Sequence, residues 1–396
     1  MNFQKTKLKN GMTIIHESRP LPVVSLSITN RFGGAYENSK IKGIAHVIEH
    51  LLFTGTKTRT HEQISREIEK KGGHLNAFTA QQVTSFWFKL PSEHIFSGLD
   101  ILTDMLNNPA FPKEKFEKEK RVIIEEIKMY HDNPRMAAME QIEKNLYDKP
   151  FGELIIGSKE TVSAIDRNFL MEFYKQMYNP KNFIVTIVGK ADFKKVCEYL
   201  EKNFASTKET PKLPPIKKLN KETTEERADQ DQAHLVFAIH APLPSDKKYY
   251  DLAVLDAYLA NGMSSKLFLE IREKRGLAYA IKSDIDAETN YSHYTIYVGT
   301  TKEAIPKVKK LILQEFKNIE NMTEKDLEEA KQRVIGLHKI SKEESINVMN
   351  ELMFSELTGK AEDYYEQEEK IQAVKLADVK AMAKINKFST AAIVPK

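Results

Sequence analysis

Hydrophobic and polar positions repeat along the chain with two different periods. Strands are predicted where apolar residues recur at every second position, and helices where they recur every three to four positions. In the first half these patterns give a strand, a helix, a second strand, a second helix and a long third helix, over residues 23–32, 44–53, 84–90, 97–108 and from Pro112 onward.

The second half repeats this succession. Its strand, helix, strand and two further helices occupy residues 233–243, 249–262, 294–300, 305–319 and 323–340. Each half closes on a short apolar strand, at 182–189 and at 390–396. We therefore predict an α+β fold with two structurally similar halves, each a mostly antiparallel sheet packed with helices.

Residues 206–227 separate the two halves and carry three prolines, many charges and no apolar period. Such a composition is typical of a linker. We expect an N-terminal domain over 1–205, a linker over 206–227 and a C-terminal domain over 228–396. At the N-terminus we predict two short strands joined by Asn10-Gly11, because this dipeptide favours a tight type I′ hairpin turn.

The composition is that of a globular protein. Hydrophobic residues make up 41% and charged residues 29% of the 396 positions, and 60 basic residues nearly balance 56 acidic ones. This balance gives no reason to expect nucleic acid or an anionic membrane as a partner. We find no apolar run near the ~20 residues of a membrane span and no features of a targeting peptide. Cys197 is the single cysteine, so a reducing compartment fits and the expected location is cytoplasmic.

The apolar helix at 44–53 carries three polar residues that a buried helix does not need. His46, Glu49 and His50 fall within an arc of roughly 100° on the helix, and most of the remaining circumference is apolar. Buried imidazoles and a buried carboxylate without partners are costly, and a divalent metal removes that cost. Two neutral imidazoles suit Zn²⁺. Glu49 is poorly placed to bind the same ion and better placed to take a proton from the attacking water.

A hydrolytic zinc ion usually has three protein ligands, so the third must come from elsewhere. The long helix after Pro112 is the best source. Glu119 and Glu126, seven positions apart, lie on the edge of its apolar stripe, whereas Glu125 projects to the opposite side. We therefore predict Glu126 as the third ligand and Glu119 as a carboxylate that orients a ligand histidine. The stripe itself consists of Phe116, Ile123, Ile127 and Tyr130.

A structural interpretation of the two histidines stands beside the metal site. Two histidines four positions apart also occur by chance, so the motif alone is a moderate signal. The second half offers a comparison, because its corresponding helix at 251–259 reads DLAVLDAYL and has no such set. The fold therefore does not require the three polar residues, which favours the metal site.

At this point the chain resembles a known family. His-x-x-Glu-His is the inverzincin order, and the chain is similar over nearly its whole length to the pitrilysin family of zinc peptidases, which includes insulin-degrading enzyme and the mitochondrial processing peptidase. The matching stretches lie at 32–56, 72–86, 122–127, 178–189 and 262–281. The resemblance implies a processing-peptidase-like, LuxS-like metallohydrolase fold and one zinc ion per chain. It also implies Glu126 as third ligand, with Glu119 matching a further family carboxylate.

The resemblance implies a substrate strand at residues 74–88. In the family, peptide substrate is laid as an added strand along an edge strand beside the zinc. An edge strand offers unpaired backbone groups, so it binds main chain with little side-chain discrimination. Phe78 and Trp87 have an alternative reading as core residues, which we favour for Trp87. The expected contact residues are Asn76, Ala77, Phe78 and Thr79.

The stretch REKRGLAY resembles a paired arginine and tyrosine of the same family. There the pair holds substrate carbonyls and helps to stabilise the tetrahedral intermediate, which implies these roles for Arg272 and Tyr279. A guanidinium and a phenol are suitable donors to an oxyanion. Without the resemblance, Arg272 reads as a solvated helix residue.

These expectations combine into a zinc-dependent endopeptidase that hydrolyses unfolded or short polypeptides inside a chamber formed by two chains. Glu49 and zinc activate the water. A chain with both the zinc motif and the Arg/Tyr pair resembles homodimeric prokaryotic members, since heterodimeric processing peptidases tend to divide the two. Two alternatives stay open, a subunit of a heterodimeric processing peptidase and a non-catalytic scaffold relative. Glu49 argues against the scaffold, which has no use for a general base.

Overall fold

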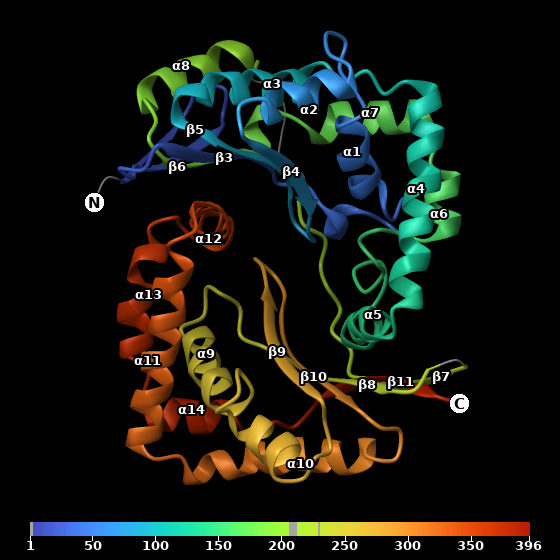
Figure 1. Cartoon of the computed structure of the whole chain (residues 1–396), viewed down its shortest axis with the longest axis vertical. Helices are drawn as coiled ribbons and strands as arrows, with labels where there is room; N and C mark the ends of the chain where they lie inside the picture. Colours follow the sequence, from blue (N-terminus) through green and yellow to red (C-terminus); the bar gives the residue numbers. More distant parts are fainter. Residues whose placement is uncertain (1–2, 206–211, 229) are drawn as a thin grey trace. The chain divides into compact units, whose positions relative to one another are not determined.

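The structure is a computed structural model that describes residues 3–205, 212–228 and 230–396 (Figure 1). The chain forms two compact units. Unit 1 comprises Met1–Lys128, Glu153–Pro215 and Lys342–Glu356, and unit 2 comprises Met129–Gly152, Ile216–Ser341 and Leu357–Lys396.

Unit 1 is built on a six-stranded sheet whose strands β2 and β6 run parallel, while every other neighbouring pair runs antiparallel. The central strands β3 and β6 are buried along almost their whole length. In spatial order the strands are β1 (Phe3–Lys7), β2 (Thr13–Glu17), β6 (Phe183–Gly189), β3 (Val23–Asn30), β5 (Thr84–Pro91) and β4 (His74–Thr79). The strand β4 forms one edge, and this edge position matters for the site below.

Helices α2, α3 and α8 lie over one face of this sheet (Figure 1). Alternate residues of β3 and β5, such as Leu26 and Phe88, join residues of α1 and α3, such as Leu51 and Leu99, in one apolar core. The helices of unit 1 include α1 (Ile44–Leu52), α2 (His61–Glu69), α3 (Ile95–Asn107), most of α4 (Lys113–Asp132), α6 (Lys159–Ala164), α7 (Arg167–Met177) and α8 (Phe193–Asn203).

Unit 2 repeats this plan on a five-stranded sheet. Its strands are β7 (Glu222–Arg227), β11 (Ser389–Pro395), β8 (Ala233–His240), β10 (Ser292–Thr300) and β9 (Ala280–Ala287), in this spatial order. Only β7 and β11 run parallel, as β2 and β6 do in unit 1. The helices include α9 (Lys248–Leu259), α10 (Ile305–Asn318), α11 (Glu324–Ser341), α13 (Asp363–Gln372) and α14 (Leu376–Met382). The predicted α+β fold with two similar, mostly antiparallel halves is confirmed.

Unit 2 also contains a helix from the first half of the sequence. Helix α5 (Pro134–Leu146) packs on β8 and β11. The Asn145 amide donates hydrogen bonds of 2.8 Å to the Thr390 carbonyl and to the Thr223 hydroxyl. Helices α5 and α10 therefore cover opposite faces of the second sheet (Figure 1).

Conversely, most of α12 (Ser345–Thr358), from the second half of the sequence, belongs to unit 1. It lies on the face of the first sheet away from α3 (Figure 1). The Ser345 and Ser25 hydroxyls share a hydrogen bond of 2.8 Å, and Glu344 forms an ion pair of 2.7 Å with Lys89. The compact units therefore differ from the expected domains 1–205 and 228–396 by an exchange of two helices.

Two local expectations need correction. Glu222–Arg227, the last part of the expected linker, forms the edge strand β7, and residues 206–211 lie outside the described residues. The strand escaped notice because an edge strand exposed on both faces carries no apolar alternation. Strands β1 and β2 form the expected hairpin, but only Gly11 has a positive φ, +93°, so the turn is not type I′. No helix among the described residues combines the length and apolar character needed to cross a membrane.

Candidate metal centre

Helix α1 is anchored at its start by a carboxylate from outside the helix. Gly43, the residue before the helix, has a φ of +97° and no side chain with which to cap it. The buried Glu37 carboxylate instead accepts hydrogen bonds from the backbone N–H groups of Gly43, at 3.0 Å, and Ala45, at 2.7 Å. The Lys42 ammonium lies 3.8 Å from this carboxylate. The Glu37 carboxyl oxygens therefore satisfy backbone N–H groups that would otherwise lack partners at the start of the helix.

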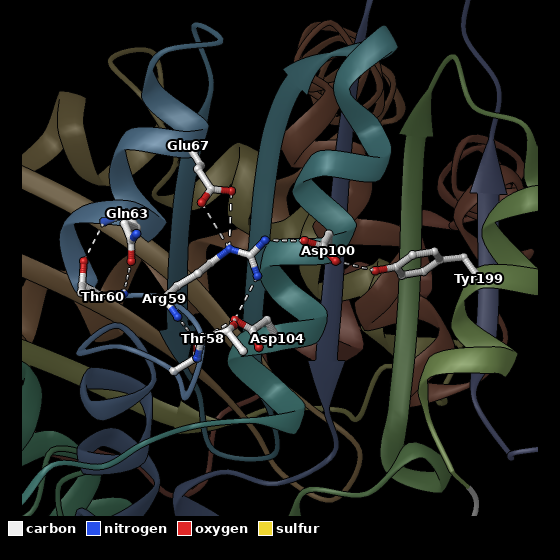
Figure 2. Close-up of polar contacts among 9 residues, drawn as sticks. Thr58, Arg59, Thr60, Gln63, Glu67, Asp100, Asp104 and Tyr199 are labelled. Atoms are coloured by element: carbon white, nitrogen blue, oxygen red, sulfur yellow. Dashed lines mark hydrogen bonds and ion pairs between the residues drawn. The ribbon is translucent and has the colours of Figure 1, made fainter.

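The segment that follows α1 is fixed by a polar network on α3 (Figure 2). The Arg59 guanidinium donates hydrogen bonds to Asp104, at 3.0 Å, and to Asp100, at 2.5 Å. The hydroxyls of Thr56 and Thr58 each donate to Asp104 at 2.6 Å. Burial raises the pKa of Asp104, but these hydrogen bonds outweigh it and lower the pKa overall. The start of α1 and the segment that follows the helix are therefore each held by side chains from outside the helix.

Three side chains converge from α1 and α4. The Glu126 carboxylate lies 3.9 Å from Nε2 of His46 and 3.6 Å from Nε2 of His50. One ligand atom from each residue can be chosen so that all three lie within 4.8 Å of one another. Within the described part of the chain, this is the one group of three or more such side chains with this spacing.

The electrostatics of this group suit a cation. Burial and the neighbouring His50 lower the pKa of His46. Burial also acts to lower the pKa of His50, but the carboxylates of Glu126 and Glu119 raise it overall. A hydrogen bond with His50 lowers the pKa of Glu126. A neutral imidazole, a second imidazole and a carboxylate form a donor set that fits Zn²⁺, whose hydrolytic sites take three protein ligands and one water.

Two further glutamates of α4, Glu119 and Glu125, lie as the helix-face argument expects. Glu119 lies 3.3 Å from Nδ1 of His50, on the ring nitrogen that does not face Glu126. A carboxylate in this position fixes the tautomer and orientation of a ligand histidine. Glu125 points to solvent, with 69% of its side chain exposed, against 24% for Glu126.

Glu49 is connected to the edge strand rather than to the three converging side chains. The Thr79 hydroxyl of β4 donates a hydrogen bond of 2.5 Å to the Glu49 carboxylate. Burial raises the pKa of Glu49, and the Thr79 hydrogen bond partly opposes that rise. The Glu49 side chain is half-buried, and the Thr79 hydrogen bond holds its carboxylate in place. Sequence reasoning missed the role of Thr79 as its partner.

The segment 74–88, which we expected to form one substrate strand, forms β4 and the greater part of β5, two antiparallel strands joined by a turn. The four expected contact residues lie on β4, which among the described strands pairs only with β5. Asn76 is exposed, while Ala77 and Phe78 are half-buried. The Phe78 ring stacks on Phe354 of α12 with centroids 6.5 Å apart. Trp87, which we expected in the core, is half-buried and lies on the face of β5 opposite the core residues Phe86 and Phe88.

Arg272 and Tyr279 lie in unit 2, whereas the converging group lies in unit 1. Arg272 belongs to a short π-helix, Phe268–Glu273, and its guanidinium lies 4.8 Å from the centroid of the Phe268 ring. Single π-helical turns often occur at functional sites. Tyr279 immediately precedes β9 and is 42% exposed. An exposed phenol and guanidinium in this segment are available to a ligand.

The corresponding helix of unit 2 has a different polar interior. Asp256 of α9 accepts a hydrogen bond of 2.7 Å from the Tyr294 hydroxyl and one of 3.2 Å from the Asn261 amide. These contacts satisfy the carboxylate with neutral donors. The repeated fold therefore places a structural aspartate in unit 2, whereas the helix of unit 1 carries the histidines and Glu49.

The chain belongs to the insulinase family, peptidase family M16. The family model described as "Insulinase (Peptidase family M16)" matches residues 12–159, and "Peptidase M16 inactive domain" matches residues 164–334. The chain is 34% identical over 334 residues to an uncharacterized zinc protease of Rickettsia felis, covering 83% of this chain and 80% of the relative. It is 29% identical over 383 residues to the uncharacterized zinc protease YmxG of Bacillus subtilis, covering 95% and 93%.

Solved structures share the fold. A protease from Helicobacter pylori superposes with a TM-score of 0.91 at 21% identity, covering 99% of both chains. A protein described as a peptidase M16 inactive domain from Pseudomonas fluorescens gives a TM-score of 0.92 at 18% identity, covering 100% of this chain and 98% of the other. At these identities the likeness extends to the fold alone.

Proposed function

We propose that this protein is a zinc-dependent endopeptidase that holds one zinc ion per chain through His46, His50 and Glu126. The observation that carries the proposal is the convergence of two imidazole Nε2 atoms on one Glu126 oxygen. Glu49 lies on α1 with the two histidines, but its carboxylate is not one of the three groups whose ligand atoms lie together. This division into ligands and a separate carboxylate is what hydrolysis requires.

A zinc ion held there supplies Lewis acidity and lowers the pKa of a water molecule. Glu49 accepts the proton from the attacking water and donates it to the departing amine. Thr79 keeps the Glu49 carboxylate in one orientation, and Glu119 does the same for the His50 ring. The general base Glu49 and the metal ligand His50 are therefore each oriented by a hydrogen bond from a neighbouring side chain.

We propose that an unfolded or short polypeptide pairs with the free edge of β4. The contact residues are Asn76, Ala77, Phe78 and Thr79. The support is that β4 is an edge strand and that its last residue contacts the general base. Main-chain pairing accepts many sequences. A substrate strand added here lies next to Glu49, which brings a scissile bond to the carboxylate.

Arg272 and Tyr279 are proposed to hold substrate carbonyls and to stabilise the negative charge that develops on the carbonyl oxygen. We propose a cytoplasmic homodimer that encloses a chamber, with the pair of one chain serving the zinc centre of the other. The presence of both motifs in one chain supports this arrangement. The competing assignments are a subunit of a heterodimeric processing peptidase and a non-catalytic scaffold.

The test is cleavage of a quenched peptide library by the pure chain, with and without a chelator, at a concentration where the mass is also measured. Chelator-sensitive cleavage by a dimer is the expected result. The Glu49→Gln variant is expected to keep zinc and peptide binding and to lose cleavage by more than about 100-fold, the usual contribution of a general base. Normal cleavage by this variant refutes the mechanism, and an inactive chain that binds zinc supports a missing partner or a scaffold.

A further inference from the structure

The ring of Tyr279 occupies the space that a side chain at Gly299 would fill. A Cβ atom built on Gly299 would lie 2.3 Å from Cζ, 2.5 Å from the hydroxyl oxygen and 2.6 Å from Cε2 of Tyr279. The Gly299 carbonyl also accepts a hydrogen bond of 3.0 Å from the Tyr279 backbone N–H. Gly299 does not have a positive φ, so its backbone conformation does not require glycine. The missing side chain instead leaves room for the Tyr279 ring.

A chain of polar contacts leads inward from the Tyr279 hydroxyl. Tyr297 lies two residues before Gly299 on β10, so its side chain is on the same face of the strand as the Tyr279 ring, and the Tyr279 side chain raises the pKa of Tyr297. The Tyr297 hydroxyl in turn lies 2.9 Å from Nδ1 of His234 on β8. Tyr279 is 42% exposed, whereas Tyr297 and His234 are buried, with 5% and 8% of their surface exposed. The exposed phenol is thus attached to two buried side chains on neighbouring strands.

Helix α5 contributes Arg135, which packs on the ring of Tyr297. The Arg135 guanidinium lies 4.8 Å from the centroid of the Tyr297 ring, which itself stacks on the His234 ring with centroids 6.0 Å apart. Burial and the charge of Arg135 lower the pKa of His234. A neutral imidazole has one N–H donor and one acceptor nitrogen. The direction of the hydrogen bonds in the chain therefore follows from which nitrogen carries the proton.

We propose that Gly299, Tyr297 and His234 are positioning residues for Tyr279. His234 donates from Nδ1 to the Tyr297 hydroxyl, and Tyr297 donates to the oxygen of Tyr279. Tyr279 then keeps its own proton for an external acceptor, with its ring held flat on Gly299. This inference rests on the role of Tyr279 proposed above, because a phenol that donates to a substrate oxygen needs its proton free.

The first test is a double-mutant cycle measured on the zinc-loaded full chain with one quenched peptide. Tyr297→Phe is expected to lower kcat roughly three- to tenfold, the range for loss of one hydrogen bond, with KM nearly unchanged. In the Tyr279→Phe background the same substitution is expected to have no further effect. Gly299→Ala is expected to lower kcat to the level of Tyr279→Phe, because the added methyl displaces the ring.

Tyr294→Phe provides a matched control. Tyr294 lies on the same strand with its side chain on the opposite face, and its buried hydroxyl donates to Asp256. This variant also loses one buried hydrogen bond, so it is expected to lower the Tm but to leave kcat and KM unchanged. A merely structural effect of Tyr297→Phe would instead match Tyr294→Phe.

The outcomes separate this inference from the proposed function. If Tyr279→Phe lowers kcat while Tyr297→Phe and Gly299→Ala do not, or if Tyr297→Phe acts equally in both backgrounds, only the positioning chain is overturned. If Tyr279→Phe has no effect while Glu49→Gln abolishes cleavage, the role of Tyr279 fails and the inference fails with it.

A spectroscopic measurement tests the chain without activity. In protein labelled with ¹³C-tyrosine, the Tyr279 ring resonance is assigned by its loss in Tyr279→Phe. It is expected to shift in Tyr297→Phe and Gly299→Ala and to stay in place in Tyr294→Phe. An unshifted resonance in both variants overturns the inference whatever the activity of the chain.

Discussion

The buried Glu37 carboxylate at the start of α1 predicts a specific dependence of stability on pH. Burial raises its pKa from the ordinary 4.5 to about 7, although Lys42 and the N–H groups of Ala45 and Gly43 act in the opposite direction. Because the folded-state pKa lies above the unfolded one, this carboxyl contributes its full stability below about pH 4.5. That contribution is lost as the pH rises through about 7.

The size of the effect follows from the two pKa values. A difference between 4.5 and about 7 corresponds to about 3 kcal/mol between the fully protonated and the fully ionised group. Between pH 5 and pH 8, linkage gives about 2.5 kcal/mol of this total. Glu37→Gln removes the titration. The free energy of unfolding of the native chain, minus that of the variant, is therefore expected to fall by about 2.5 kcal/mol across this interval.

The chain contains one tryptophan, Trp87 on β5 of unit 1, which allows the unfolding of this unit to be followed by fluorescence. Urea titrations of the metal-free native chain and of Glu37→Gln at pH 5, 6, 7 and 8 give the difference at each pH. Glu125→Gln is the matched control, since this carboxylate is 69% exposed on α4. Its curve is expected to stay parallel to that of the native chain. A constant difference for Glu37→Gln, or one that grows with pH, refutes the reasoning.

Further predictions concern the metal centre and its support. Glu126→Gln is expected to weaken zinc binding by roughly 100-fold or more and Glu119→Gln by about 10- to 100-fold, whereas Glu125→Gln is expected to leave it unchanged. The affinities are measured by competition with a fluorescent chelator, and equal affinities for all three variants contradict the assignment. Removal of zinc is expected to lower the urea midpoint reported by Trp87, because zinc binds only the folded site; a midpoint independent of zinc contradicts a site in unit 1. Asp104→Asn is expected to destabilise the same transition by about 1–3 kcal/mol, since buried donors lose a charged acceptor; an unchanged midpoint shows that the network of Figure 2 is not needed for stability.

Periodicity was enough to predict the repeated fold and the helix faces on which His46, His50 and Glu126 lie. The 3.6-residue period separated Glu126 from Glu125, and the structure exposes their side chains by 24% and 69%. This worked because both helices are amphipathic or apolar and the polar positions interrupt the pattern. To predict which face of a helix a residue occupies, only the periodicity of that one helix is needed.

What stayed hidden depends on contacts between elements. An apolar stripe shows which face of a helix is buried but not which sheet buries it, so the exchange of α5 and α12 has no signal in the sequence. Gly299 is indistinguishable from any strand glycine until the Tyr279 ring is placed on it. Glu37 and Thr79 act on α1 from segments that the local pattern treats separately.

The exchange of helices has a consequence for the order of synthesis. Unit 1 includes Lys342–Glu356, so a nascent chain cannot complete it until about nine-tenths of the polypeptide has left the ribosome. Unit 2 in turn needs Met129–Gly152, which is made early and must wait for a sheet encoded after residue 216. Cutting the gene at the proline-rich segment therefore yields two fragments that each lack a helix. We therefore expect folded protein when the two fragments are co-expressed and not from either fragment alone.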